Sequence, residues 1–259
     1  MPAPPVGYAG EVTLPDGSVL ELAAVTDQGP VRRENQDRWA VLPLAGAVAL
    51  LVADGMGGHA DGGLAAELAV GAVARQLEAA SQPDAALAVA VAAANDAIAD
   101  RSESAGALGM GTTLVAAVVR DRSAQLINVG DSRAYRIRDA VAEPVTSDHS
   151  WVAEEIAAGR LPARALRQDP RRSVITRALM GSPVAGDEYR LRLAPDDVLL
   201  LCSDGLWEPL EDDQLGRLLG ARRGRLADDL ARVCSAAIDA GGTDNVTGVA
   251  CRLRESDVG

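Results

Sequence analysis

Runs of apolar residues of strand length recur along the chain and alternate with two long alanine-rich segments. The apolar runs, bounded by turn residues, predict strands at 18–26, 38–43, 47–53, 112–120, 124–129, 133–138, 196–202 and 245–254. Helix composition and helical spacing predict an antiparallel helix pair at 62–80 and 84–102, with further helices near 211–219 and 223–240. Because strands come in runs and helices in pairs, the pattern favours an α+β layered sandwich with antiparallel sheets over a doubly wound fold.

Two segments fall outside this pattern. Residues 1–17 are expected to form a flexible lead-in, because they are rich in Pro and Gly and end in the Pro15-Asp16-Gly17 turn signal. Residues 149–190 mix a short helical run with three prolines and a group of arginines, which predicts an irregular insertion. The length of 18–259, with this insertion included, fits a single domain.

The composition narrows the class of protein. Of the 259 residues 48% are hydrophobic but only 2% are aromatic, so small aliphatic side chains have to fill the core. The formal net charge is -12 and every basic residue is Arg, which argues against nucleic acid as a partner. The longest apolar stretch, 44–53, is too short to span a bilayer. We expect a cytoplasmic protein without membrane or nucleic-acid partners, and a monomer.

Two of the apolar runs share the same ending. Each suits a strand that is buried on both faces and ends abruptly in Asp-Gly, at Asp54-Gly55 and at Asp204-Gly205. Each places a carboxylate at a strand end, and Gly55 leaves a main-chain carbonyl accessible to a cation. One Asp-Gly pair alone is more often an ordinary turn, so the inference depends on the residues that accompany these two.

Three more aspartates occupy comparable positions. Asp37 and Asp244 each precede a predicted strand, and Asp131 follows one. Each alone is more often a turn or cap residue, but several carboxylates in one dry site repel one another unless cations neutralise them. Oxygen ligands point to magnesium or manganese, and the presence of only two histidines disfavours zinc.

Such a site suits the hydrolysis of phosphate esters. Two divalent ions roughly 3.5 to 4 Å apart activate a bridging water and orient it for in-line attack on a phosphoryl group. The substrate also needs a positive partner, and Arg32, five residues before Asp37, is the candidate that would hold phosphate oxygens bidentately. The alternative for Arg32 is a surface arginine beside Arg33.

Eight motifs follow one another along the chain: Thr26-Asp-x-Gly-x-Val-Arg32-x-x-Asn-Gln-Asp37, Val52-Ala-Asp54-Gly-Met-Gly-Gly-His59, Gly111-Thr-Thr113, Val129-Gly-Asp131-Ser-Arg-Ala-Tyr135, Asp148-His-Ser150, Ile175-Thr-Arg-Ala-Leu179, Ser203-Asp204-Gly-Leu206 and Thr243-Asp244-Asn-Val-Thr247. In this order they resemble the metal-dependent Ser/Thr protein phosphatases of type 2C (the PPM family) in their bacterial form. The resemblance covers about 21–252.

The resemblance implies a four-layer α-β-β-α sandwich with two central antiparallel sheets flanked by helix pairs, and a metal centre at one end. It implies hydrolysis of phosphoserine and phosphothreonine by attack of a metal-activated water, with two Mn2+ or Mg2+ ions in the core site and a third in some bacterial members. The implied partners are phosphoprotein substrates and a Ser/Thr kinase or its targets. The insertion at about 149–190 corresponds to the family's flap, which lies beside the active site.

The resemblance also implies a role for each candidate residue. Asp54 would bridge the two metals, Gly55 would offer its carbonyl to one, and Asp204 and Asp244 would bind the other. Asp37 would orient metal-bound water, and Arg32 would bind the substrate phosphate. Asp131, together with Asp204, matches the pair that holds the third metal.

Two positions depart from part of the family. Gln36 stands where some members carry Glu, so it brings no charge, and weaker metal affinity is expected. Met56 stands where animal-type members place a His that is the candidate general acid, so the leaving-group proton has to come from elsewhere. For the two histidines, His59 and His149, a structural role is favoured over a part in proton transfer.

Other functions remain open at this point. The chain could be a non-catalytic module that recognises phosphoproteins, although such relatives are expected to lack metal-binding aspartates. It could also act mainly on phosphoprotein regulators such as anti-anti-sigma factors, with the same chemistry. Five arginines of the insertion could attract acidic or phosphorylated segments, although a solvated surface is the favoured role for Arg160, Arg164, Arg167, Arg171 and Arg172.

Overall fold

The computed structural model describes residues 6–56, 61–105, 109–220 and 224–254, which form two antiparallel sheets packed face to face. In the described residues the larger sheet has the order β1 (Val6–Thr13), β2 (Val19–Asp27), β13 (Val246–Arg254), β12 (Val198–Cys202), β9 (Arg133–Arg138), β10 (Val141–Pro144). The smaller has the order β11 (Asp187–Arg192), β8 (Ser123–Val129), β7 (Leu114–Arg120), β4 (Ala47–Ala53), β3 (Arg38–Leu44). A separate two-stranded antiparallel sheet pairs β5 (Gly55–Met56) with β6 (Gly111–Thr112).

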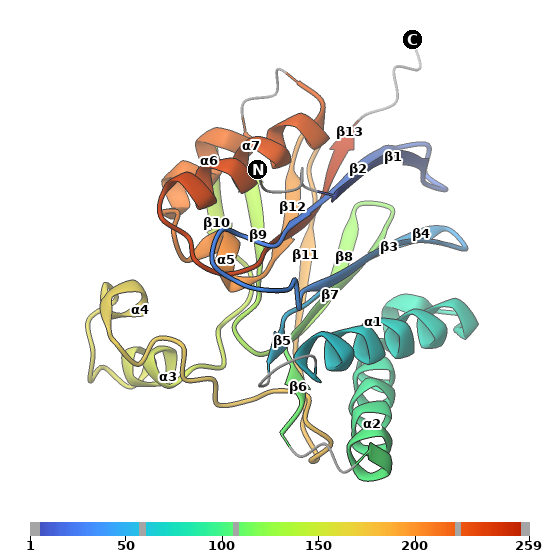
Figure 1. Ribbon diagram of the computed structural model, residues 1–259. Coiled ribbons are helices and arrows are strands. Elements are labelled where there is room, and N and C mark those ends of the chain that lie inside the picture. The colour runs from blue at the N-terminus through green and yellow to red at the C-terminus, as the bar shows by residue number, and fades with distance from the viewer. Residues whose placement is uncertain (1–5, 57–60, 106–108, 221–223, 255–259) are drawn as a thin grey trace.

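Helices cover the outer face of each sheet (Figure 1). The long pair α1 (Asp61–Ala79) and α2 (Leu87–Ala105), joined through the 3-10 turn η1 (Pro83–Ala86), packs on the smaller sheet. The larger sheet is covered by α5 (Asp204–Trp207), α6 (Asp212–Leu219) and α7 (Leu226–Asp239). The expected α-β-β-α sandwich is therefore confirmed.

The side chains of β4 point alternately to the two faces of the smaller sheet, and both faces are covered, which explains why every residue of the strand is apolar. Leu50 and Val52 point into the apolar layer between the sheets. Ala49 and Leu51 point the other way, into the layer under α1 and α2. Every residue of the strand is buried, because both faces of the sheet are covered. The prediction of strands buried on both faces is confirmed.

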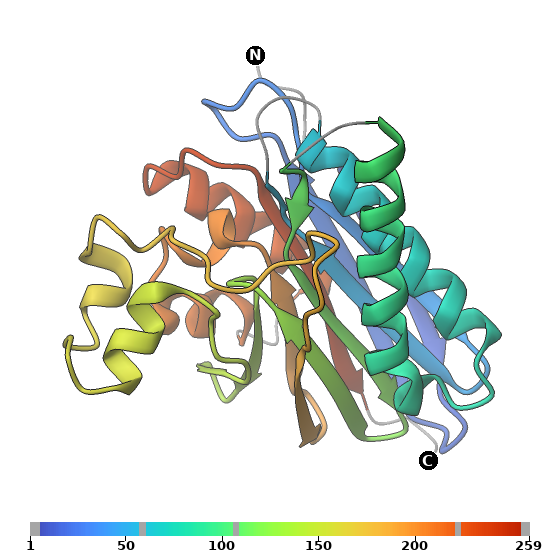
Figure 2. The same cartoon turned by 90° about the horizontal axis from the view of Figure 1, so that it is seen from below.

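The flap carries α3 (Trp151–Ala157) and α4 (Ala165–Gln168) and stands away from the two sheets (Figure 2). Its entry and exit are tied to each other by the bridge between Ser150 and Ile175, and its exit pairs with β6 through Leu179 and Thr112. The end of the flap therefore lies beside the two-stranded β5–β6 sheet that follows β4.

Two expectations about elements were wrong, and one edge strand was missed. Residues 6–13 of the expected flexible lead-in form β1, which pairs with β2 along its whole length, because Tyr8 and Val12 alternate onto the apolar layer between the sheets. The end of the predicted irregular insertion belongs to β11, which alternates half-buried and exposed residues as an edge strand. The short edge strand β10 was not predicted. Among the described helices, none combines the length and the apolarity that crossing a membrane requires.

Candidate metal centre

Five aspartates that are distant in the sequence meet at one end of the sandwich. Asp54 follows β4, Asp131 follows β8, Asp204 follows β12, and Asp37 and Asp244 precede β3 and β13. A cavity of about 650 Å³ is lined by Asp54, Gly55, Asp131, Asp204, Asp244 and Arg32. Asp37 does not line the cavity but lies close to it: it is 3% exposed, its charge acts on Asp54, and the Ser203 hydroxyl donates a hydrogen bond of 2.7 Å to its Oδ2. The structure thus brings the predicted set together.

The main chain at Asp54 is fixed by two threonines. Its N–H donates to Thr113 Oγ1 at 3.0 Å, and its carbonyl accepts from the Thr113 N–H at 2.9 Å and from Thr112 Oγ1 at 2.8 Å. At the next residue, a Cβ on Gly55 would stand 2.2 Å from the carbonyl oxygen of Gly62 in α1. Only glycine fits there, because the start of α1 approaches the strand end so closely.

Asn245 joins the segments that carry Asp37, Arg32 and Asp244. Its side-chain amide donates to the carbonyls of Gln28 and Glu34 at 2.8 and 3.0 Å and accepts from the Gln36 N–H at 2.8 Å. The residue is 4% exposed. The Asn245 side chain therefore holds the loop from 28 to 36 next to Asp244.

Asp131 is supported by a buried group of charged and aromatic side chains. Trp207 Nε1 donates to its carbonyl at 3.0 Å, and the Arg133 guanidinium lies 3.3 Å from the centroid of the Trp207 ring. Arg133 also makes two 2.7 Å hydrogen bonds to the Asp148 carboxylate. Because this bidentate pair is buried, it holds Trp207 and Asp131 in one geometry.

Burial and mutual repulsion keep these carboxyls from ionising readily. Burial raises the pKa of Asp204 to about 6, and the charge of Asp244 adds to the shift. Burial also raises the pKa of Asp37 to about 7, against the effect of hydrogen bonds from Thr247 and Ser203. The pKa values of Asp54 and Asp131 are raised well above the ordinary range, first by burial and then by the neighbouring aspartates.

Several carboxylate oxygens of the site have no hydrogen-bond partner although they are buried. They are the Oδ1 atoms of Asp37, Asp131 and Asp204. An unpartnered buried acceptor is costly, and a hard divalent cation is the partner that several carboxylates can share. In the described part of the chain, no group of three or more Asp, Glu, His or Cys side chains is already closed into a metal-binding cluster. The oxygen donors fit Mg2+ or Mn2+ chemically, but a coordination shell would need side-chain adjustment and further ligands such as water or a main-chain carbonyl.

Arg32 lines the cavity, and its side chain is engaged by Asp244. Its Nη2 lies 2.5 Å from Asp244 Oδ2. This hydrogen bond raises the pKa of Arg32, and the charges of Asp54 and Asp204 act in the same direction. Gln36 and Met56, the two positions that depart from part of the family, also line the cavity.

Of the two histidines, only His149 belongs to the residues that the structure describes. His59 lies outside the described residues. His149 is 2% exposed, its Nδ1 accepts from the Gly130 N–H at 3.1 Å, and its Nε2 lies 3.2 Å from Asp187 Oδ2. Burial lowers the pKa of this imidazole, so it is held neutral. It does not line the cavity, which supports the structural role for His149.

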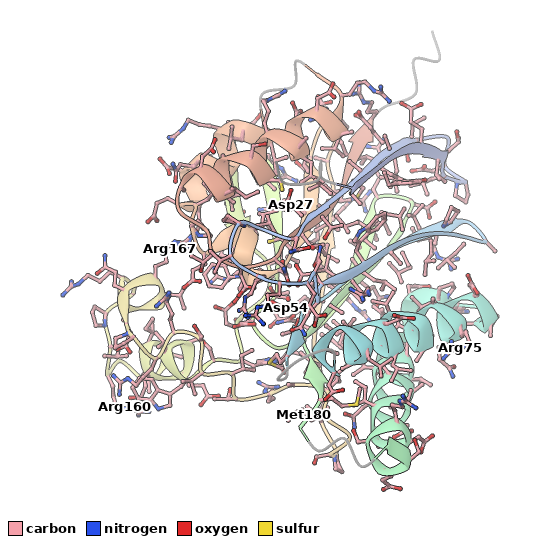
Figure 3. The ribbon with its side chains drawn as sticks, viewed as in Figure 1. Asp27, Asp54, Arg75, Arg160, Arg167 and Met180 are labelled. Carbon is pink, nitrogen blue, oxygen red and sulfur yellow. The ribbon has the colours of Figure 1, made fainter. Side chains whose placement is uncertain are left out.

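The arginines of the flap separate into two groups. Arg160 pairs with Glu155 within the flap, and Figure 3 shows it at the outer end, away from Asp54. Arg171 pairs with Asp169 and lies over the Trp151 ring. In contrast, Arg167 and Arg172 line the cavity. Arg167 donates to the Leu210 carbonyl and pairs with Asp212, and Arg172 pairs with Glu208.

Sequence reasoning assigned no role to several residues that build the site. Thr113, Arg133, Asp148, Ser203 and Asn245 all stand inside the quoted motifs, and Trp207 follows one directly. Their hydrogen bonds described above join residues that are between 15 and 217 positions apart. The signal that could have found them was their place next to the candidate aspartates.

Comparisons with known proteins agree with this architecture. The protein phosphatase 2C family model matches residues 32–245. The chain is 37% identical over 244 residues to serine/threonine protein phosphatase PstP of Mycobacterium tuberculosis, covering 93% of this chain but 46% of that protein. It is 34% identical over 231 residues to serine/threonine phosphatase stp of Listeria monocytogenes, covering 86% of this chain and 91% of that protein. The chain thus spans about half the length of the mycobacterial relative.

A solved structure extends the likeness to three dimensions. The catalytic domain of PstP in complex with two manganese ions superimposes with a TM-score of 0.81 at 35% identity, over 92% of this chain and 99% of that one. The family model covers most of the chain, and the sheets, helices and aspartates lie in the order that the resemblance implied. The chain therefore belongs to the protein phosphatase 2C family.

Proposed function

We propose that this chain is a metal-dependent protein phosphatase that hydrolyses phosphoserine and phosphothreonine. The observation that carries the proposal is the set of buried, unpartnered oxygens of Asp37, Asp131 and Asp204 beside a cavity that Arg32 also lines. The names of the relatives support the same reaction.

The metal site would be built from side chains and one main-chain oxygen. Asp54 would bridge two ions, with the Gly55 carbonyl on one of them and Asp204 and Asp244 on the other. Asp131 and Asp204 would hold a third. The ions, Mn2+ or Mg2+, would activate water as the nucleophile and neutralise the charge that develops on the phosphoryl group. The two manganese ions of the related PstP structure support the core pair.

The remaining steps belong to residues of the chain. Arg32 would hold two phosphate oxygens and so align the phosphorus with the nucleophile. Asp37 would orient the attacking water through its unpartnered Oδ1, while Ser203 holds the other oxygen. Met56 has no proton to give, so the serine or threonine oxygen would take its proton from solvent in the cavity.

The cellular setting is part of the proposal. The substrates would be phosphoproteins that a Ser/Thr kinase modifies, in the cytoplasm, and the enzyme would act as a monomer. The names of the relatives support protein substrates. Regulators such as anti-anti-sigma factors would be one class of target within the same chemistry.

Turnover of p-nitrophenyl phosphate and of a phosphothreonine peptide tests the proposal. Activity should require added Mn2+ and disappear in excess chelator, and Asp54→Asn and Asp204→Asn should each lose most of it. Asp96→Asn, an exposed position on α2, is the matched control and should keep wild-type rates. Equal rates with metal and with chelator would contradict the proposal. Tight binding of the phosphopeptide without any turnover would favour a non-catalytic binding module.

A further inference from the structure

Asp244 differs from three of the other aspartates of the site in the state of its oxygens. The Oδ1 atoms of Asp37, Asp131 and Asp204 are buried without a partner. Both oxygens of Asp244 are used: Oδ1 accepts from the Asn245 N–H at 2.8 Å, and Oδ2 accepts from Arg32 Nη2 at 2.5 Å. Asp244 therefore already holds a cationic partner, which a divalent cation at this carboxylate would have to face or displace.

The two partners of Asp244 are not equally easy to give up. The bond from Asn245 joins neighbouring residues in a segment that is packed closely, since a Cβ on Gly29 would stand 2.1 Å from the Asp244 carbonyl oxygen. Arg32 approaches from solvent, and its side chain is 54% exposed. Release of Oδ2 by Arg32 needs only a side-chain rotation, because Asn245 keeps the main chain of the loop in place.

The charge of Arg32 acts on the whole group of carboxylates. Asp54 and Asp204 also raise the pKa of Arg32, so its guanidinium serves as a counter-charge for the site. The other arginines that line the cavity are engaged elsewhere, Arg167 with Asp212 and Arg172 with Glu208. Among the three arginines that line the cavity, Arg32 is thus the one that pairs with an aspartate of the site.

We propose that Arg32 competes with divalent cations for Asp244, so that cation binding and release of the phosphate-binding arginine are one exchange. The proposal rests on the proposed function. Without cations Arg32 neutralises the carboxylates. When Asp244 coordinates a cation instead, the Arg32 guanidinium is released. It remains beside the same cavity, where it can donate to two oxygens of a phosphate group. The phosphate clamp is then available only after the site has been loaded.

Calorimetric titration of the chelator-treated full chain with MnCl2 tests the exchange. Arg32→Ala and Arg32→Gln should bind Mn2+ more tightly than wild type, by roughly threefold to tenfold, because a competing and repelling charge has been removed. Arg33→Ala removes the same charge from the adjacent exposed position, which has no ion pair among the described residues, and should stay within about twofold of wild type. Affinity of the Arg32 variants equal to or weaker than wild type would overturn the inference.

Thermal melts give a readout that does not depend on the binding isotherm. In excess chelator Arg32→Ala should melt at a lower temperature than Arg33→Ala, because the aspartates have lost their counter-charge, and saturating Mn2+ should remove this difference. Equal melting in chelator would overturn the exchange while leaving the proposed reaction intact. A wild-type chain that binds no Mn2+ would overturn both.

Discussion

Trp207 Nε1 donates a 3.0 Å hydrogen bond to the main-chain oxygen of Asp131, so the first turn after β12 supports the loop after β8. The same ring carries the Arg133 guanidinium on its face. Asp204 starts the helical turn that Trp207 ends. One indole therefore ties together the two aspartates that are proposed to share a third ion.

Removal of this hydrogen bond should loosen Asp131 without emptying the core. We expect Trp207→Phe to lower the free energy of unfolding by about 1 to 2 kcal/mol, because a buried carbonyl loses its donor while an aromatic ring stays beneath Arg133. Activity at saturating Mn2+ should change less than activity at low Mn2+. Urea unfolding measures the loss of stability, and turnover at increasing Mn2+ concentrations measures the change in metal dependence. Trp151→Phe, in the flap, is the control, and an identical metal dependence of the two variants would contradict the role given to Trp207.

The raised pKa values of the aspartates predict how stability depends on pH in the absence of metal. Asp37 and Asp204, with folded pKa values of about 7 and about 6, stay protonated at pH values where the unfolded chain ionises them. Their contribution to stability is complete below about pH 4, falls as the pH rises above that value, and is used up at about pH 6 for Asp204 and about pH 7 for Asp37. Each such group changes the free energy of unfolding by about 1.4 kcal/mol per pH unit within that window.

Denaturant unfolding in chelator at pH 5.5, 6.5 and 7.5 measures this loss. We expect stability to fall across the series, and Asp37→Asn to flatten the decline, whereas Asp96→Asn should leave it unchanged. Saturating Mn2+ should stabilise the protein most at pH 7.5, since protons no longer compete for the carboxylates. Rising stability from pH 5.5 to 7.5 in chelator would show that the carboxyls are ionised in the folded chain.

A methyl group at residue 55 should damage both stability and metal binding. Gly55→Ala places a Cβ 2.2 Å from the Gly62 carbonyl oxygen, so the strand end or the start of α1 has to move. We expect a loss of about 2 to 3 kcal/mol in unfolding free energy and weaker Mn2+ binding. Gly71→Ala is the matched control within α1, where the added Cβ meets only Arg75 Nη1 at 3.4 Å. It should raise stability by about 0.5 to 1 kcal/mol through helix propensity.

Charge changes in the flap should separate the arginines that line the cavity from those that do not. Arg160→Glu should leave kcat/KM for a phosphothreonine peptide within about twofold of wild type, because Arg160 pairs inside the flap. Arg172→Glu replaces a cation of the cavity wall with a carboxylate. The new carboxylate lies next to that of Glu208 and repels it. We expect a fall of about tenfold for the peptide and a smaller one for p-nitrophenyl phosphate. Equal effects on both substrates would place Arg172 outside peptide recognition.

The layers of the fold could be predicted because their signal is local. β4 and β12 are apolar at every position, and α1 and α2 are long and rich in alanine. The edge strands β1, β10 and β11 were missed or misassigned, since exposure on one side leaves glycine, charge and proline in their sequences. An edge strand forms because it pairs with a neighbouring strand on one side only. The sequence of the edge strand does not reveal which strand that neighbour is.

The aspartates of the site were predicted from their positions at strand ends, and the structure brings them together. Their roles as ligands remain predictions. The supporting residues could not be ranked from the sequence, because Asn245 and Trp207 act through main-chain groups on other segments. The pairing of Arg32 with Asp244 could not be foreseen either, since 212 positions separate them and each had been given a different partner.

The scarcity of aromatic residues has an optical consequence. The chain has three tryptophans and no phenylalanine. Trp207 lies behind the metal-site aspartates and Trp151 sits in the flap beneath Arg171, while Trp39 belongs to β3. Two of the three indoles that emit in the ultraviolet therefore lie next to the cavity and in the flap. Quenching of that emission would follow cation loading and flap displacement in real time, and single Trp→Phe variants would assign each component to its source.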